Sequence, residues 1–400
     1  MTTPAVPKAK TAPRRVSVLG STGSVGCNTI DLIRRHEGSF VVEALTAKSN
    51  VKLLSEQAKA LKARIAVVSD ETFYEDLKDA LAGTGIEAAA GNQAVTDAAA
   101  RPADWVMASI VGVAGLKPTL AAVKQGAVVA LANKECLVSA GDVMLSEIRR
   151  NGATLLPVDS EHSAIFQVFN FDEPEKVRRI ILTASGGPFC TKTSKEMAKM
   201  SPAEAVSHPN WDMGAKISVD SATMMNKGLE LIEAYHLFPV TEGQIEILVH
   251  PQSVIHSMVD YVDGSVLAQL GTPDMRTPIA YALGWPSRME APAPSLKLED
   301  IATLTFEPPD FERFPALKIA RQALKIGGGA PTILNAANEV AVQCFLTEQI
   351  GFLDIARVVE ETLERCPAGQ LRNLSEVIET DKESRKVAED IVTNYRFGKN

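Results

Sequence analysis

A glycine-rich stretch near the start of the chain places the strongest constraint on its fold. Residues 20–26 read GSTGSVG, with the apolar run 16–19 before them and an amphipathic segment, 28–35, after them. Glycines between a strand and a helix let the backbone turn sharply and approach a pyrophosphate, while the helix N-terminus offers free N–H groups. The stretch therefore predicts a dinucleotide site. Its alternative is a glycine turn that serves packing alone.

Strand-like and helix-like segments keep alternating over residues 15–158. This alternation is typical of right-handed βαβ crossovers and a parallel sheet, so we expect an α/β, Rossmann-like NADP-binding domain there. The tail 1–14, with prolines and basic residues but no acid, is expected to be disordered. Strands are expected at 16–19, 40–47, 65–68, 105–109 and 127–131, and helices at 28–35 and 51–61.

The rest of the chain has different patterns. Residues 159–286 indicate an α+β domain, in which Asp263-Gly264 between apolar runs is a hairpin signal. The proline-rich stretch 287–316 indicates a linker, and 317–400 has the periodicity of a C-terminal helical bundle. Strands are expected at 179–183 and 244–250, and helices at 163–169, 226–236, 317–326, 330–347, 352–365 and 374–396.

Composition excludes several classes of function. The net charge is −8 and no long basic stretch interrupts it, which argues against a nucleic-acid partner. No apolar run approaches the roughly 18 residues of a membrane span, and the first residues lack the apolar core of a signal peptide. The five cysteines are scattered without a CxxC pair, so no disulfide framework is expected. We expect a cytoplasmic protein that acts on a small molecule, away from membranes.

The residues after the second expected strand bear on the choice of cofactor. They read Lys48-Ser49-Asn50, where an NAD site usually places an acid for the ribose 2′-hydroxyl. A cation and two polar groups suit a 2′-phosphate, which favours NADP. Thr22 and Ser24 would add hydroxyl groups near the other phosphates. The alternative for Lys48 is a solvated lysine in a turn.

Three carboxylates suggest a divalent cation. Asp159 and Glu161 are two residues apart, so on an extended segment both would point the same way and repel each other unless a cation neutralised them. Glu230, with Asn226 and Lys227 on the same helix face, would supply a third carboxylate and an anion-binding pair. Oxygen ligands of this kind favour Mg²⁺ or Mn²⁺. The alternatives are an ordinary acidic surface and a polar helix face with a local ion pair.

Other segments suit a phosphate. Ser185, followed by two glycines after an expected strand, can present backbone N–H groups to an anion, and Ser221 adds a hydroxyl. The irregular, aromatic segment 207–214 can act as a lid that excludes water. The alternative for its His208 is a purely structural histidine.

Six motifs in this order together resemble a known enzyme family. They are GSTGSVG at 20–26, ANKECL at 132–137, VDSEHSA at 158–164, ASGGPF at 184–189, HPNWDM at 208–213 and KISVDSATMMNKGLE at 216–230. The chain resembles the 1-deoxy-D-xylulose 5-phosphate reductoisomerases over nearly its whole length. The resemblance implies a three-part homodimeric enzyme of the non-mevalonate isoprenoid route. Such an enzyme uses NADPH and a divalent metal to convert 1-deoxy-D-xylulose 5-phosphate to 2-C-methyl-D-erythritol 4-phosphate.

The resemblance also implies roles for individual residues. Asp159, Glu161 and Glu230 would bind the metal, while Lys134 and Ser160 would hold the hydroxyl and carbonyl end of the substrate. Ser185, Ser221, Asn226 and Lys227 would bind the phosphate, with His208, Trp211 and Met213 closing over the substrate. Thr22, Gly23, Ser24, Val25, Asn50, Asn133, Glu135 and Gly214 would contact NADPH. The family commonly reads AGKN after the second strand, whereas residues 47–50 read AKSN, which displaces the lysine by one.

The expected reaction leaves alternatives open. The carbon skeleton would rearrange by retro-aldol and aldol steps or by a direct ketol shift, and hydride transfer to the resulting aldehyde would follow. Lys134 and a water molecule on the metal are both candidates for the general base. A different NADP-dependent dehydrogenase would not need the three carboxylates together. A cofactor-binding sensor would not need the phosphate-binding residues.

Overall fold

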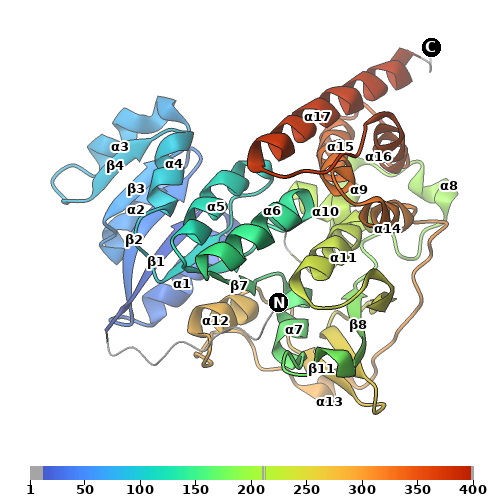
Figure 1. The fold of residues 1–400 in the computed structure, drawn as a ribbon, viewed down its shortest axis with the longest axis horizontal. Coiled ribbons are helices and arrows are strands. Elements are labelled where there is room, and N and C mark those ends of the chain that lie inside the picture. The colour runs from blue at the N-terminus through green and yellow to red at the C-terminus, as the bar shows by residue number, and fades with distance from the viewer. Residues whose placement is uncertain (1–11, 210, 212, 398–400) are drawn as a thin grey trace.

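Two β-sheets organise the chain, and helices cover them (Figure 1). The computed structural model describes residues 12–397 apart from 210 and 212. The first sheet has seven strands in the order β4-β3-β2-β1-β5-β6-β7, and all neighbouring strands run parallel. Its strands are β1 (Arg14–Leu19), β2 (Phe40–Ala47), β3 (Ile65–Val68), β4 (Glu87–Ala90), β5 (Trp105–Ala108), β6 (Val128–Leu131) and β7 (Thr154–Pro157).

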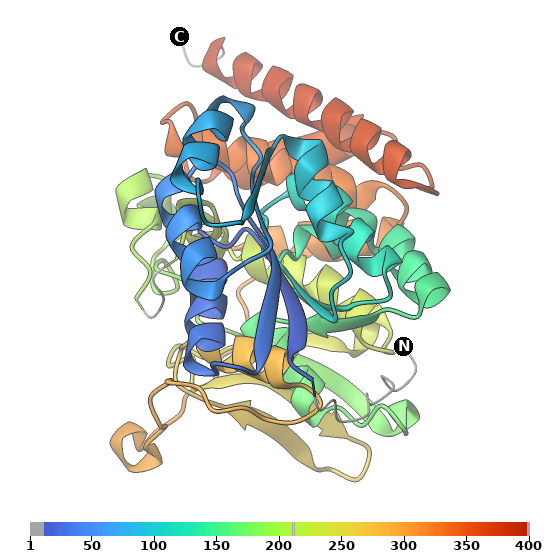
Figure 2. The ribbon, with the colours of Figure 1, turned by 90° about the vertical axis from the view of Figure 1, so that its left-hand side faces the viewer.

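Helices cover both faces of this sheet, as Figure 2 shows with blue and teal helices on either side of the strands. Successive residues of a strand point to opposite faces. In β3, Ala66 and Val68 join one apolar core, whereas Ile65 and Val67 join another. The strands are therefore mostly apolar on both faces, as the sequence patterns indicated. The covering helices are α1 (Ser24–Arg35), α2 (Val51–Leu61), α3 (Tyr74–Ala80), α4 (Asn92–Ala99), α5 (Leu116–Lys124) and α6 (Glu135–Asn151).

The predicted strands of this region are confirmed, but the sequence analysis missed β4 and β7. These are the two edge strands of the sheet. Strand β4 reads EAAA and is half-exposed, while β7 has four residues and ends in Pro157. An edge strand pairs on one side only, so its sequence carries a weaker β signal than a central strand does.

The second sheet has four strands in the order β11-β10-β8-β9. Strands β10 and β11 form the predicted hairpin, and Gly264, with a φ of +90°, lies in its turn. Strand β8 runs antiparallel to β10 and parallel to β9. Helix α7 packs against β10 and β11. The elements are α7 (Ser160–Val168), β8 (Val177–Ala184), β9 (Ile245–Val249), β10 (Ile255–Tyr261) and β11 (Val266–Leu270).

The predicted C-terminal helices are confirmed, and they pack on the middle of the molecule. Helix α11 (Met225–Leu237) lies between the second sheet and these helices (Figure 1). One continuous apolar core runs from α5 and α6 through α11 into the helical region. The helices are α14 (Ala316–Ile326), α15 (Ala330–Leu346), α16 (Asp354–Arg365) and α17 (Leu374–Phe397).

The segments between the predicted domains make specific contacts. Helix α12 (Arg276–Gly284) packs on α1, and Ile279 and Leu283 join the core on that face of the parallel sheet. The indole N–H of Trp105 donates to the carbonyl of Ala282 at 3.0 Å. Within the predicted linker, Glu307 pairs with Val249 through two backbone hydrogen bonds. No helix in the described part of the chain combines the length and hydropathy needed to cross a membrane.

Gly228 provides a test of the packing between α11 and α14. A Cβ atom at this position would lie 2.7 Å from the Cβ of Ala320, whereas a Cβ at the exposed Gly243 would meet nothing within 4 Å. We expect Gly228→Val to lower the free energy of unfolding by about 1–3 kcal/mol, because a close-packed contact must open. Gly243→Val should change it far less. Urea unfolding checks this expectation, and equal effects of the two substitutions would contradict the packing.

Candidate active site

The predicted site residues gather at one edge of the parallel sheet. Gly20 follows β1, Lys48 follows β2, Lys134 follows β6 and Asp159 follows β7. Because these strands are parallel, their carboxyl ends lie at the same edge, where open α/β sheets bind ligands. Four stretches that are far apart in the sequence therefore lie along the same edge of the sheet.

The glycines at 20–26 have different structural roles. Gly20 has a φ of +85°, which favours glycine, and it makes the turn after β1. A Cβ at Gly26 would lie 2.2 Å from the carbonyl oxygen of Gly20, so only glycine lets α1 approach this turn. Gly23 is exposed and precedes the first residue of α1. Ser24 is exposed at the start of α1, and Thr22 and Val25 are half-buried beside it. The turn thus presents a helix N-terminus, as predicted.

Lys48, Ser49 and Asn50 are all exposed at the end of β2. The Asn50 side chain caps α2 by accepting a hydrogen bond from the Leu53 backbone N–H at 3.2 Å. These residues lie at the same edge of the sheet as the glycine turn, because β2 is the parallel neighbour of β1. A cation beside that turn suits a phosphate.

Asn133 and Glu135 flank Lys134 between β6 and α6, and both side chains have partners within the protein. The Asn133 amide donates to the carbonyls of Ile110 and Gly112 and accepts from the backbone N–H of Cys136. Asn133 therefore anchors the loop that follows β5.

Glu135 is tied to more distant helices. Its carboxylate pairs with Lys216, on α10 (Ala215–Ala222), at 2.9 Å. Lys216 also pairs with Asp220, which accepts from Asn338 of α15. This chain of charged and polar contacts links α6, α10 and α15. Sequence reasoning assigned Glu135 to NADPH and did not find these partners.

The three carboxylates do converge, but along a different backbone path from the predicted one. Helix α7 begins at Ser160, immediately after Asp159, so Glu161 lies in its first turn. The prediction of an extended segment was wrong, because the helix starts three residues before its apolar pattern does. Glu230 comes from α11, and oxygen atoms of all three carboxylates lie within 4.8 Å of one another.

Two lysines neutralise these carboxylates. The Lys134 ammonium lies 2.5 Å from Asp159 and 3.0 Å from Glu230. The Lys227 ammonium contacts Glu161 at 2.9 Å and also Glu230. Three negative charges thus face two positive charges. Around them, Asn226 donates to Glu230 at 2.5 Å and accepts from Lys134 at 2.8 Å, and Ser160 donates to Glu161 at 2.6 Å.

Burial and pairing shift the pKa values of these groups in opposite directions. Burial raises the pKa of the Glu161 carboxyl, but the Lys227 and Lys134 ammonium groups and the Ser160 hydroxyl together outweigh it and lower that pKa to about 2. Burial, together with repulsion from Glu161, raises the pKa of Glu230. Burial lowers the pKa of Lys134, but the charges of Asp159 and Glu230 outweigh it and hold that pKa well above its ordinary value. The shifts at Glu161 and Lys134 favour the charged forms of these two groups.

A second group of predicted residues gathers after β8. The Ser185 hydroxyl lies 3.0 Å from Nε2 of His208 and accepts from the Gly187 backbone N–H at 3.2 Å. A Cβ at Gly187 would lie 2.4 Å from the carbonyl oxygen of Ser221, so the Ser185 turn abuts the end of α10. Burial lowers the pKa of His208.

The predicted lid segment, 207–214, is described only in part, because Asn210 and Asp212 lie outside the described residues. The Trp211 backbone N–H donates to Nδ1 of His208 at 3.1 Å. The indole ring of Trp211 lies 6.2 Å from the imidazole ring of His256, centroid to centroid. Met213 is half-buried, and Gly214 is exposed just before α10. Hydrogen bonds thus connect the described lid residues His208 and Trp211 to Ser185.

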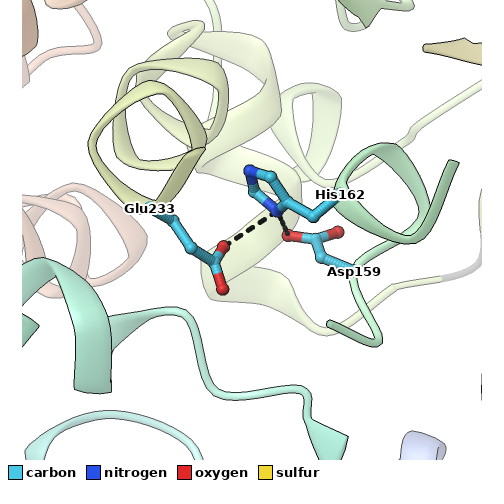
Figure 3. Close-up of side chains that lie close together, drawn as sticks. All are labelled: Asp159, His162 and Glu233. Carbon is cyan, nitrogen blue, oxygen red and sulfur yellow. Dashed lines mark ion pairs between the residues drawn. The ribbon is translucent and has the colours of Figure 1, made fainter. Parts of the chain in front are cut away.

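Sequence reasoning missed two buried residues at this site, His162 and Glu233 (Figure 3). Nδ1 of His162 lies 3.1 Å from the Glu233 carboxylate and 3.9 Å from that of Asp159. Burial lowers the pKa of His162, but the charges of Glu233, Asp159 and Glu230 together outweigh it and raise that pKa to about 9. Each residue follows a predicted metal ligand by three positions, and that spacing was the available signal.

Comparison with known families agrees with this arrangement. The family model of 1-deoxy-D-xylulose 5-phosphate reductoisomerase matches residues 16–141. The model of its C-terminal domain matches residues 155–238, and that of the DXP reductoisomerase C-terminal domain matches residues 270–387. Together the three models cover most of the parallel sheet, strand β8 of the second sheet and most of the helical region.

Individual relatives match over almost the entire chain. A 1-deoxy-D-xylulose 5-phosphate reductoisomerase of Rhodospirillum centenum is 64% identical, covering 96% of this chain and 95% of its own. One of Zymomonas mobilis is 58% identical, covering 93% and 96%.

Solved structures give the same result. A Zymomonas mobilis enzyme in complex with NADPH superposes with a TM-score of 0.91 at 56% identity, covering 95% of this chain and 99% of its own. A DOX-P reductoisomerase in complex with NADPH, fosmidomycin and magnesium gives 0.90 at 42% identity, covering 95% and 98%. With its fold, its carboxylate cluster and its sequence in agreement, this chain belongs to the 1-deoxy-D-xylulose 5-phosphate reductoisomerase family.

Proposed function

We propose that Asp159, Glu161 and Glu230 bind the divalent cation, Mg²⁺ or Mn²⁺, with which this enzyme works. The enzyme rearranges and reduces 1-deoxy-D-xylulose 5-phosphate to 2-C-methyl-D-erythritol 4-phosphate, with NADPH as reductant. The observation that carries the assignment is the convergence of three carboxylates within 4.8 Å, one buried and two half-buried, with only two ammonium groups to neutralise them. Hard oxygen donors with an excess negative charge are what such a cation requires.

The same geometry supports proposed roles for Lys134 and Lys227. Each ammonium group occupies carboxylate oxygens that a cation would need. When the carboxylates bind the cation, both ammonium groups lose these partners. Lys134 is then available to the oxygen atoms at the carbonyl end of the substrate, together with Ser160. Lys227 and Asn226 are available to the phosphate. The cation itself supplies a Lewis acid and a template for the adjacent carbonyl and hydroxyl oxygens.

The group around Ser185 supplies the remaining phosphate contacts in this proposal. Its glycine backbone can present N–H groups, and the Ser185 and Ser221 hydroxyls can donate to phosphate oxygens. His208 lies at hydrogen-bond distance from Ser185, so it can close over the phosphate, while Trp211 and Met213 exclude water. Phosphate binding away from the reacting carbon atoms orients those atoms.

NADPH is assigned to the turn between β1 and α1 and to the residues after β2. Gly23, Thr22, Ser24 and Val25 would contact the pyrophosphate region, and Lys48, Ser49 and Asn50 the 2′-phosphate. Asn133, Glu135 and Gly214 would border the cofactor nearer the carboxylates. The hydride that NADPH donates must reach the substrate at the cation, and β6 and β7 hold the Lys134 and Asp159 stretches at the edge that also carries this turn.

The decisive experiment measures NADPH oxidation by the full-length protein with 1-deoxy-D-xylulose 5-phosphate and either Mg²⁺ or Mn²⁺. We expect turnover to require the cation and to stop with a chelator. Glu230→Gln should lower turnover by roughly 10³-fold, since a bound cation contributes several kcal/mol, yet leave NADPH binding intact. Glu246→Gln, on the outer strand β9, is the matched control. Turnover in the presence of chelator would contradict the proposal.

Substitutions at two glycines of the turn should have different effects on stability and on NADPH affinity. Gly26→Ala should lower the free energy of unfolding by about 1–3 kcal/mol, because its Cβ would overlap the Gly20 carbonyl. In Gly23→Ala the new Cβ would lie 3.4 Å from that carbonyl, so stability should change by no more than about 1 kcal/mol. NADPH affinity should nevertheless fall, because the methyl group would face the pyrophosphate. Urea unfolding and NADPH fluorescence titration test both, and unchanged affinity in Gly23→Ala would contradict the placement.

We also propose that two copies of the chain pair through β11. This strand forms one edge of the second sheet, and Val266, Leu267 and Leu270 on it are between 37% and 50% exposed. An exposed apolar edge strand offers unpaired backbone groups to a second copy.

Sedimentation velocity tests the dimer. We expect the wild-type chain to sediment as a dimer and Leu267→Asp to shift it toward the monomer. Ile326→Asp, which places the same charge on an exposed apolar residue of the helical region, should leave the dimer intact. A monomeric wild type, or a Leu267→Asp variant as dimeric as the wild type, would contradict pairing through β11.

We also propose limits for the domains and a location for the enzyme. We divide the chain into a tail, 1–14, an NADPH domain, 15–158, a catalytic domain, 159–286, a linker, 287–316, and a helical domain, 317–400. We further propose that the enzyme is cytoplasmic. Cys27, Cys136, Cys190 and Cys366 are free thiols, as is usual in a reducing compartment.

A further inference from the structure

His162 and Glu233 form a buried pair directly behind the carboxylate cluster. The His162 side chain is fully buried and the Glu233 side chain is 1% exposed, with 3.1 Å between Nδ1 and the carboxylate. In Figure 3 the imidazole, which comes from α7, lies between Glu233 of α11 and Asp159. The ring of Phe238 lies 6.5 Å from that of His162. The pair is thus shielded from water on its apolar side.

Both ring nitrogens of His162 face acceptors on the same helix. Nδ1 faces the Glu233 carboxylate, and Nε2 lies 2.9 Å from the backbone carbonyl of Glu230. Helix α11 therefore holds the imidazole at two points, one turn apart. The carbonyl that Nε2 contacts belongs to one of the three clustered carboxylate residues. The histidine itself stands in the first turn of α7, next to Glu161.

These contacts connect the two elements that supply the cluster. Asp159 and Glu161 belong to the start of α7, and Glu230 belongs to α11. The distance between the start of α7 and α11 decides how far the first two carboxylates stand from the third. A buried histidine that contacts α11 at both ring nitrogens restricts that distance more firmly than apolar contact does, because its polar groups lose their partners if the helices separate.

We propose that Glu233 is a positioning residue: through His162 it fixes the start of α7 against α11 and so sets the spacing of Asp159, Glu161 and Glu230 for the divalent cation. The inference rests on the proposed role of these three carboxylates. Outer groups that orient ligands in this way typically contribute 10–100-fold to metal affinity.

The test is the binding of Mn²⁺ to full-length protein without substrate, followed by calorimetry and by the electron paramagnetic resonance of free Mn²⁺. Glu233→Gln keeps the size of the side chain but removes its charge. We expect its Kd for Mn²⁺ to rise at least about 10-fold. The Mn²⁺ concentration needed for half-maximal turnover should rise in parallel, whereas kcat at saturating Mn²⁺ should change much less. Glu242→Gln, which makes the same charge change outside the cluster, should bind Mn²⁺ as the wild type does.

A second variant guards against a loss of folding. Glu233→Asp keeps the charge but withdraws the carboxylate by one methylene from His162. It should weaken Mn²⁺ binding in the same direction, and thermal unfolding identifies which variants fold. Wild-type Mn²⁺ affinity in either folded variant would overturn the proposal.

Two further outcomes distinguish a failure of the role of Glu233 from a failure of the proposed cation site. Wild-type Mn²⁺ binding in Glu230→Gln would refute the proposed cation site itself, whatever Glu233 does. Asp159, His162 and Glu233 also bring one ligand atom each within 4.8 Å of one another. Two Mn²⁺ ions per wild-type chain, with one lost in Glu233→Gln, would make Glu233 a ligand and overturn its positioning role.

Discussion

The neutralisation of buried carboxylates by buried lysines is the interaction on which this structure depends. Glu230 has no exposed surface, and the Lys134 and Lys227 side chains are 8% and 4% exposed. An ionised group taken out of water costs several kcal/mol unless partners compensate it. Because each lysine contacts Glu230 and one further carboxylate, the strand end that carries Lys134, the start of α7 and helix α11 must all be in place together. The fold brings three separate stretches to one point, and their charges hold them there.

The parallel sheet makes this convergence possible. Its carboxyl edge collects the stretches after β1, β2, β6 and β7, so the glycine turn and the carboxylates share one side of the molecule. Helix α11 enters from the other half of the chain, and it begins after Met224, whose φ is +63°. That left-handed turn redirects the chain between α10 and α11. The helix can then present Asn226, Lys227 and Glu230 toward the sheet edge.

Local signals in the sequence predicted much of this arrangement, whereas long-range partners could not be predicted from it. The glycine turn and the central strands have strong short-range patterns, and the three carboxylates were identified by residue type. The extended backbone predicted at Glu161 was wrong, because the polar first turn of α7 lacks the apolar pattern that would have indicated a helix. The pairing of Glu135 with Lys216 spans 81 residues, and that of His162 with Glu233 joins two helices. Such contacts depend on how elements dock, which spacing within one segment does not reveal.

The docking of α12 on α1 has a consequence for the order in which the protein can be made. The N-terminal sheet is built from the first 157 residues, yet Ile279 and Leu283 complete one of its cores, and Trp105 bonds to Ala282 across 177 positions. On the ribosome, therefore, the nucleotide-binding half emerges with an apolar face still uncovered. More than a hundred further residues must be synthesised before α12 can cover that face. Contacts between residues so far apart in the sequence slow folding and leave aggregation-prone intermediates. During synthesis this chain therefore passes through a stage in which an apolar surface is exposed for a chaperone to bind.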